Sequence, residues 1–539
     1  MMMTKATTTG GSGTKGNMRI VPPDGRTEIR IGVDIDRMVQ EGSAALASDP
    51  DTYVRGGALV HVSRAVESTR AHAMPVGSPV IRTMTRSTLR SRLSRSALWI
   101  RWKNNEWKEC TPAEHATAAL LDEGSWSEVP QLVGVTETPM LRPDGSILQA
   151  AGYDDATGYL YVPSERYPPV PDEPTQEDAR DALAQLALVF ATGPAGFPFA
   201  SPAAQMVPIA ALCTLLARAS IAGSVPAIVI DASTKGSGKS LLTDAIAIIA
   251  NGRAAARTTY PPEPEELRKV LDGYALQGAS FIGIDNVDHA LGGAALDAFL
   301  TAHDTVDVRE LGRTGQRTVP WRAVIFATGN NVTYAGDTIR RVIRARLEPE
   351  CEKPEDRTDF AIDDLRAHAT AARPRLVVAA LTILRAFVHA GRPGAADRRW
   401  GSFEAWARLI PPAIRFAGGP CVLDARVADT AENDPMTAAL GAILMHLPRL
   451  AETSHPRARD VVHALYSRDH DAAPDGFDDL RDAIECVART PAGKAPGARN
   501  VGEAFRRLRG RWIAGRRLLS EIDRHSKVVR WFVEVRPAT

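Results

Sequence analysis

The eight residues at 233–240 (STKGSGKS) have the types and order of a phosphate-binding loop. They lie between an apolar run expected to be a strand, 226–231, and a run expected to be a helix, 241–250. A glycine-rich turn at a helix N-terminus points backbone N–H groups at an anion. Lys239 is then expected to reach the β- and γ-phosphates of ATP or GTP, and the Ser240 hydroxyl to bind Mg²⁺. The predicted nucleotide-binding residues are Ser233, Thr234, Lys235, Gly236, Ser237, Gly238, Lys239, Ser240 and Leu241.

A second element, SFIGID at 280–285, is an apolar run that ends in Asp285. A carboxylate at the end of a buried strand beside the loop is the arrangement that positions Mg²⁺, so Asp285 is the second predicted metal ligand. Asn286 follows it where ATPases of this kind usually carry Glu, and an amide cannot accept a proton from water. Either another carboxylate is the base, with Glu266 the main candidate beside Glu265 and Asp288, or hydrolysis is slow.

Two further groups complete the predicted catalytic set. The strand in AVIFATGNN, 323–331, would carry Asn330 out beside the γ-phosphate, where an amide can orient water; Asn331 is the alternative, and a simple turn is another. Arg340 and Arg341 follow in GDTIRRVIRARLEP, 336–349. Guanidinium groups there can stabilise the γ-phosphate of a neighbouring subunit, which would require a closed ring, or they form surface ion pairs.

The elements that position these residues alternate between strand and helix, which is typical of an α/β fold with a parallel sheet. Five strands are expected, at 226–231, 256–260, 280–285, 322–328 and 344–348. The length of 539 residues indicates several domains. The predicted ranges are a disordered leader at 1–18, an N-terminal α+β domain at 19–165, a linker at 166–178, a helical lead-in at 179–224, the ATPase core at 225–358, a helical domain at 359–454 and a winged-helix DNA-binding domain at 455–539.

The order GSGKS, IGIDN, LGR, ATGNN, DTIRR, EKPEDR resembles the helicase module of phage, plasmid and integrative-element primase-helicases, of the poxvirus type, among the AAA+ and superfamily III proteins. The resemblance covers 179–358, and GYDDATGYLYVP at 152–163 is similar to their upstream domain. It implies an AAA+ P-loop core, ATP and Mg²⁺ as cofactors, and a homo-oligomeric, hexameric ring that translocates on DNA, with a primase as a possible partner. The loop that grips the strand would match 308–320, with Arg313 and Arg317 at its tips and Arg309 nearby.

Two local zones could bind nucleic acid, although the net charge is only +1. The stretch 68–105 contains no acid and combines arginines with Trp99 and Trp102, a composition suited to single strands; a solvated helix packed by its tryptophans is the other interpretation. The stretch 499–519 reads as a basic helix followed by a two-stranded wing, which could also be a protein docking module. Its expected phosphate contacts are Arg506, Arg507, Arg509, Arg511, Arg516 and Arg517.

The remaining features bound the class of protein. The five cysteines form no Cys-x-x-Cys pair, and there is no apolar run of about 18 residues or signal-peptide core, so a cytoplasmic protein without membrane contact is expected. The two carboxylates in GVDIDRM, 32–38, are interpreted as structural. The sequence therefore predicts an ATP-dependent DNA helicase of a mobile element's replication machinery. The alternative is a slowly hydrolysing, ATP-gated DNA-binding assembly, such as an origin binder or a defence-system switch.

Overall fold

The computed structural model describes residues 26–66, 75–310, 315–351, 353–395, 400–426, 435–450, 455–466, 476–488, 495–523 and 528–536. The predicted leader at 1–18 lies outside them. The chain divides into two compact units, Met1–Val62 with Ile81–Leu132, and Ser63–Val80 with Val133–Thr539. The boundary at 132/133 falls inside the range 19–165, which the sequence analysis assigned to one domain.

The first unit packs three helices against one face of a three-stranded sheet. The helices are α1 (Ile35–Ala47), α2 (Arg86–Ser96) and α3 (Glu114–Asp122), and the sheet has the order β1 (Thr27–Arg30), β5 (Ala97–Lys103), β6 (Glu106–Glu109). Ile29 and Trp99 of the sheet are buried among apolar residues of the helices. The Asp34 side chain caps α1 by accepting the backbone N–H of Arg37 at 3.1 Å, which agrees with a structural role for this carboxylate of 32–38.

Short strands and two helices precede the large sheet in the chain. β2 (Tyr53–Val54), β3 (Leu59–Arg64) and β4 (Pro79–Thr83) form one small sheet, most of whose residues belong to the first unit. In the second unit, β10 (Gly152–Asp154), β11 (Tyr159–Tyr161) and β7 (Gly134–Thr136) form another. β8 (Met140–Leu141) pairs with β9 (Ile147–Leu148). Helix α4 (Gln176–Val189) begins with a capping box between Thr175 and Asp178. Helix α5 (Pro202–Leu216) carries apolar residues on all sides and is therefore buried.

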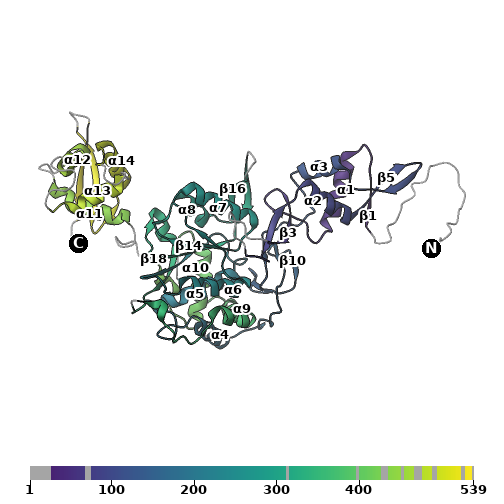
Figure 1. The fold of residues 1–539 in the computed structure, drawn as a ribbon, viewed down its shortest axis with the longest axis horizontal. Helices are drawn as coiled ribbons and strands as arrows, with labels where there is room; N and C mark the ends of the chain where they lie inside the picture. Colours follow the sequence, from purple (N-terminus) through teal and green to yellow (C-terminus); the bar gives the residue numbers. More distant parts are fainter. Residues whose placement is uncertain are drawn as a thin grey trace. The chain divides into compact units, whose positions relative to one another are not determined.

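The five predicted strands form one parallel sheet, which confirms the α/β prediction. Its order is β13 (Arg257–Thr259), β14 (Phe281–Val287), β18 (Val324–Asn330), β12 (Ala227–Ala232), β20 (Val342–Leu347). Figure 1 labels two of these strands, β14 and β18. Alternate residues of β12 face opposite cores. Ile228 and Ile230 pack with α5, α6 (Lys239–Asn251) and α9 (Leu365–His389), whereas Val229 packs with α7 (Pro264–Gln277) and α8 (Ala294–Thr301). Because helices cover both faces of the sheet, the side chains on both sides of β12 are buried. The strand therefore shows no alternation of apolar and polar residues.

Smaller elements follow this sheet. They are β15 (Leu291–Gly292), the hairpin of β16 (Thr305–Arg309) and β17 (Gln316–Pro320), β19 (Tyr334–Ala335), the 3-10 turns η1 (Gly336–Arg341), η2 (Pro354–Asp356) and η3 (Val422–Ala425), and helix α10 (Glu404–Phe416). The C-terminal elements are α11 (Pro435–Leu450), α12 (Ala458–Tyr466), α13 (Asp478–Ala488), α14 (Ala498–Leu508), β21 (Trp512–Ile513), β22 (Arg516–Ile522) and β23 (Val529–Val535). They share an apolar core of their own around Phe505 and Trp531. Within the described ranges, no helix is long and apolar enough to cross a membrane.

Candidate nucleotide-binding site

The phosphate loop connects the buried strand β12 to α6. Gly236 and Gly238 both adopt left-handed φ angles, 73° and 87°. Residues that have a Cβ atom rarely adopt this conformation. Ser233 stands where a glycine is usual, but its φ is not positive, and its N–H donates to the Leu347 carbonyl at 3.2 Å. The Ser237 hydroxyl donates to the Thr234 carbonyl at 2.8 Å and so closes the turn. A serine is therefore compatible with this loop geometry.

Lys239 is the first residue of α6, and its amino group is held at the carboxyl end of the sheet. Its Nζ donates to Oδ1 of Asn330 at 2.7 Å and to the Thr234 carbonyl at 3.3 Å. Burial lowers the pKa of Lys239, while the carboxylates of Asp231 and Asp285 act in the opposite direction. The structure thus brings together the loop lysine and the amide that the sequence singled out from the strand at 323–331.

Asp285 lies near the end of β14, next to β18 in the sheet. Its carboxylate accepts a hydrogen bond from the Thr328 hydroxyl, which fixes its orientation. No group of three or more His, Cys, Asp or Glu side chains among the described residues is placed to hold a metal ion. Mg²⁺ does not need such a group, because it is usually held by one or two protein oxygens together with phosphates and water. A Ser240 hydroxyl and an Asp285 carboxylate fit that requirement.

Asn286 has a left-handed backbone, with φ of 55°. The pairing of β14 with β18 shifts register between Ile284 and Val287, and the Asn286 N–H donates to the Thr328 hydroxyl at 3.3 Å. Asparagine tolerates this conformation better than most residues do. The amide at this position therefore suits a bulge in the strand, which the sequence analysis did not anticipate.

A buried ion pair beneath the loop also went unpredicted. Asp231, at the end of β12, has no exposed surface, and it pairs with Arg346 of β20 at 2.7 Å while accepting the Val332 N–H at 3.1 Å. Arg346 also donates to Oδ1 of Asn331 at 2.9 Å, and Asn331 donates to the Ser233 carbonyl at 3.3 Å. Asn331, the alternative sensor, is thus tied to the backbone of the loop. The only sequence signal was an aspartate in an otherwise apolar strand.

A pocket of about 220 Å³ opens beside the loop. Its walls include the loop residues Gly236 to Gly238, with Leu241 and two aromatic residues, Phe197 and Phe360. Phe197 is so close to the loop that a Cβ at Gly238 would lie 3.1 Å from its ring. A pocket with aromatic and aliphatic walls next to a phosphate loop can accommodate the purine ring of a nucleotide. The sequence analysis proposed neither of these aromatic residues for the nucleotide site.

Two of the three candidate bases pair with residues of their own segments. Glu266, in the first turn of α7, pairs with Lys269 at 2.6 Å and is about half exposed. Glu265 is exposed on the same turn, and Asp288 pairs with His289 at 2.7 Å. Acidic residues in a first helical turn are favoured by the helix dipole. The geometry therefore assigns no general base among these three carboxylates.

The two predicted finger arginines differ in their surroundings. Arg341 is mostly buried and pairs with Asp297 of α8 at 2.6 Å. Arg340 has a side chain 62% exposed and pairs only one turn back, with Asp337 at 2.7 Å. Surface ion pairs of this kind contribute little to stability. Of the two arginines, Arg340 can therefore more easily exchange its pairing with Asp337 for another ligand.

The hairpin of β16 and β17 occupies the region expected to grip a strand. Arg309 ends β16, and its side chain is exposed. Arg317 was expected at the tip, but it lies within β17 opposite Val308, and its mostly buried side chain pairs with Glu310 at 3.3 Å. The tip assignment for Arg317 was therefore wrong. Arg313 lies outside the described residues.

The C-terminal arginines expected to contact phosphates lie in the last turn of α14, in the segment after it and at the start of β22. The guanidinium group of each of the six already has a partner within the C-terminal elements. Arg507 donates to the Val487 carbonyl at 2.9 Å, Arg511 to the Thr437 hydroxyl at 2.7 Å, and Arg509 to the Ser520 hydroxyl at 3.2 Å. Arg517 pairs with Glu534 and lies over the Trp512 ring at 4.6 Å. Arg506 and Arg516 donate to backbone carbonyls at 3.3 and 3.5 Å. Contacts to DNA from this set remain a prediction.

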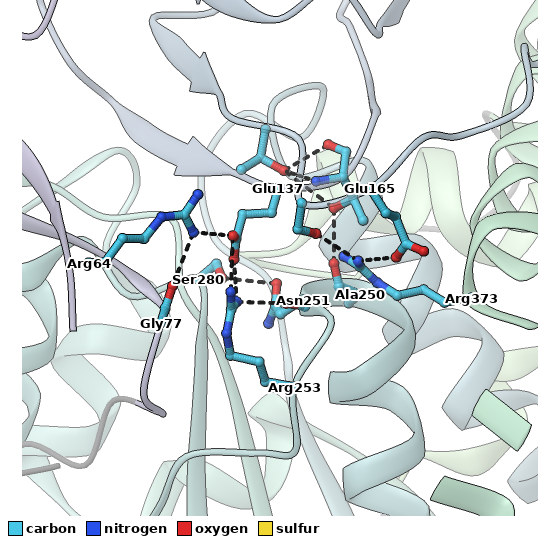
Figure 2. A network of polar contacts seen from close by, with 12 residues as sticks. Arg64, Gly77, Glu137, Glu165, Ala250, Asn251, Arg253, Ser280 and Arg373 are labelled. Carbon is cyan, nitrogen blue, oxygen red and sulfur yellow. Dashed lines mark hydrogen bonds and ion pairs between the residues drawn. The ribbon is translucent and has the colours of Figure 1, made fainter. Parts of the chain in front are cut away.

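The far end of α6 is held by a polar junction (Figure 2). Glu137, almost fully buried, is contacted by Arg64 and by Arg253, which follows the last turn of α6. The Thr138 hydroxyl donates to the Ala250 carbonyl at 2.9 Å, and Arg373 of α9 donates to the Ile249 carbonyl at 3.1 Å. These donors satisfy carbonyls that a helix end leaves without partners. The helix that starts at Lys239 is thus fixed at both ends.

Comparisons with known proteins give weak likenesses. No protein-family model matches the chain, and no curated protein matches it. Among solved structures, the chain is similar to the apo C-terminal region of NrS-1, with 10% identity, a TM-score of 0.32, and coverage of 88% of this chain and 96% of that one. It is also similar to JCV helicase bound to a thiazolopyridine compound, with 15% identity, a TM-score of 0.18, and coverage of 50% and 73%. Both TM-scores are low, so neither likeness supports a conclusion about this chain.

Proposed function

We propose that the chain is an ATP-dependent DNA helicase or translocase of an AAA+ type, working as a homo-oligomeric ring, with a hexamer as the expected form. One observation carries this proposal: Asp285 near the end of β14, Asn330 at the end of β18 and Lys239 in the loop after β12 lie together at the carboxyl end of the sheet. These three strands are neighbours in the sheet. Ligands of open α/β sheets bind at this edge.

In the proposed reaction, the loop N–H groups and Lys239 bind the β- and γ-phosphates of ATP, while the base lies against Phe197 and Phe360. Asp285 and Ser240 would hold Mg²⁺, which neutralises charge on the phosphates when bound. Asn330 orients the attacking water with its amide. Arg340 of one protomer stabilises the charge that develops on the γ-phosphate in the next protomer.

Translocation would follow from the position of the β16–β17 hairpin. The hairpin is joined to α7 through the Arg309 N–H, which donates to Asp272 at 3.2 Å. Changes at the nucleotide site would move the hairpins along a central strand of DNA, with Arg309 in contact with phosphates. A role in the replication of a phage, plasmid or other mobile element, with a primase as partner, belongs to the same proposal.

Strand displacement on a forked DNA tests the proposal. Wild-type protein with ATP and Mg²⁺ is expected to unwind the fork, and Lys239→Ala is expected to abolish both unwinding and ATP hydrolysis. Asp36→Ala, far from the loop in sequence and in the other unit, is the control. Unwinding that persists in Lys239→Ala would refute the proposal.

The second candidate function is a slowly hydrolysing, ATP-gated DNA-binding assembly. Asn286 favours it, because this position offers an amide and no carboxylate to accept the proton. Nucleotide-dependent assembly on DNA by the wild-type protein, without unwinding and with turnover far below one per minute, would support it over the motor.

A further inference from the structure

The pocket beside the phosphate loop has two walls that come from distant parts of the chain. One wall is formed by residues between 188 and 198, from the end of α4 and the turn after it. The other is formed by residues between 354 and 365, from η2 and the segment that leads to α9. Each wall carries one aromatic side chain, Phe197 or Phe360. The residues that join the walls are 161 to 164 positions apart, so only tertiary contacts keep the walls together.

Arg357 of the second wall supplies such a contact. Its Nη2 atom donates to the Gly196 carbonyl at 3.1 Å and to the Pro194 carbonyl, and it lies 3.5 Å from the Gly193 carbonyl. All three acceptors belong to the turn that precedes Phe197. A guanidinium group suits this contact, because its planar fork of N–H groups can serve several acceptors. A single side chain therefore fastens the second wall to the turn that sets the position of the first.

The same guanidinium group covers the aromatic residue of its own wall. Its Cζ atom lies over the Phe360 ring, 5.0 Å from the centroid, in a cation–π contact. Phe360 is 40% exposed, so this cover matters for the position of the ring. The next residue, Ala361, donates its N–H to the Ala195 carbonyl at 2.9 Å, which is a second tie to the same turn. Arg357 thus orders both aromatic walls, and a pocket ordered in advance costs its ligand less entropy.

The charges of the pocket indicate which part of a nucleotide it accepts. Its lining includes the acidic residues Glu355 and Asp363, and the Nη2 of Arg357 is directed at backbone carbonyls. Carboxylates repel a triphosphate, whereas Lys239 attracts it at the first turn of α6. A base has no charge and presents flat faces that aromatic side chains favour. The pocket therefore suits the base, and the loop suits the phosphates.

We propose that Arg357 is a positioning residue for the base of a purine nucleotide. It latches the turn at 193–196 to the segment at 354–365 and so keeps Phe197 and Phe360 in place for the base. This role rests on the proposed function, which places ATP at the loop, and it adds the side chain on which affinity for the base depends. Arg357 acts through the two walls, and the triphosphate is held without it.

Isothermal titration calorimetry of the full chain with Mg²⁺ tests this role by comparing ATP with inorganic tripolyphosphate, which has no base. Arg357→Ala is expected to weaken ATP binding about tenfold and to leave tripolyphosphate affinity within about twofold. The tripolyphosphate affinity also shows that the variant is folded and its loop intact. In steady-state ATPase assays, KM should rise while kcat stays nearly unchanged. Arg357→Lys keeps the charge with fewer donors, so it should fall between wild type and Arg357→Ala, and it carries the comparison if the alanine variant does not fold.

Two further variants show whether Arg357 acts through the wall. Phe360→Ala should weaken ATP binding by a similar factor, and combining it with Arg357→Ala should add little, because both remove the same wall. Arg385→Ala is the matched control. Arg385, in α9, also donates to a backbone carbonyl, that of Val170 at 3.3 Å, but it does not line the pocket. Its replacement should leave ATP affinity unchanged.

Three results would overturn the proposal. They are unchanged ATP affinity in Arg357→Ala, an equal loss of affinity for ATP and tripolyphosphate, and a wild-type chain that binds tripolyphosphate as tightly as ATP. Each is distinct from a failure of the proposed function. A loss confined to ATP in Arg357→Ala, with no unwinding by the wild type, would retain the latch and refute only the motor. Unwinding by the wild type, with unchanged ATP affinity in Arg357→Ala, would refute only the latch.

Discussion

The Nζ of Lys239 and the Oδ1 of Asn330 are joined by a 2.7 Å hydrogen bond, although 91 residues separate them in the chain. Lys239 opens α6, and Asn330 closes β18, so the bond links the phosphate loop to the neighbouring strand. In the proposed function, this contact holds the Asn330 amide beside the position expected for the γ-phosphate. It distinguishes Asn330 from Asn331, which bonds to Ser233 and Arg346 instead.

Replacing Asn330 by Ala should slow hydrolysis more than it weakens binding. An amide that acts mainly on the attacking water contributes chiefly in the transition state, so kcat is expected to fall about 100-fold while nucleotide affinity changes little. Steady-state ATPase assays and titration with a fluorescent ATP analogue would measure the two effects. Asp36→Ala, in the other compact unit, is the control. A loss of affinity as large as the loss of kcat would contradict the assigned role.

Asn286→Ala should lower stability without abolishing hydrolysis. An alanine forced into the left-handed region costs about 1 kcal/mol, whereas Asn286→Gly should cost less because glycine adopts it freely. Thermal unfolding of both variants would measure this difference. Their ATPase rates would show whether the amide takes part in the chemistry, and a rate lost in Asn286→Gly despite intact folding would make Asn286 catalytic.

Arg340 should act across the subunit boundary. Arg340→Ala and Lys239→Ala are each expected to be inactive as ATPases, but mixed rings would contain interfaces in which an intact loop meets an intact arginine. The mixture should therefore recover part of the wild-type rate.

Arg341→Ala provides the contrast, because its pairing with Asp297 predicts a loss of stability that mixing does not repair. A mixture of Arg340→Ala and Lys239→Ala no more active than its components would argue against action in trans.

Glu137→Gln should destabilise the unit that contains the sheet. The substitution leaves Arg64 and Arg253 facing each other without a carboxylate, and because both are partly exposed the expected loss is about 2 kcal/mol. Asp172→Asn, whose side chain is 92% exposed and pairs with Arg385 at 3.0 Å, should have a smaller effect. Differential scanning calorimetry of both variants would compare them. Equal decreases in Tm for the two variants would show that the burial of Glu137 does not set the size of the stability loss.

The local pattern of the sequence was sufficient for the sheet and the loop. Apolar runs that alternate with helical periodicity predicted all five parallel strands, and the glycine spacing predicted the turn at 233–240. Asp285 was proposed as a metal ligand in the same way, since a carboxylate near the end of an apolar strand is visible in a short window of residues. These features depend on neighbours close in the chain, so periodicity and residue type reveal them.

Contacts between distant segments were decided only by the tertiary structure. Periodicity could not tell that Arg346 would neutralise Asp231, or that Glu137 would meet Arg64 and Arg253, 73 and 116 residues away. It also could not tell that Trp99 faces the core while Trp102 extends beyond it on the same strand. Pairing partners and burial depend on how elements pack in space, and a buried charge or an exposed indole is set by that packing. The sequence by itself singled out the residues that are proposed to carry the chemistry, and the fold decided which of them meet.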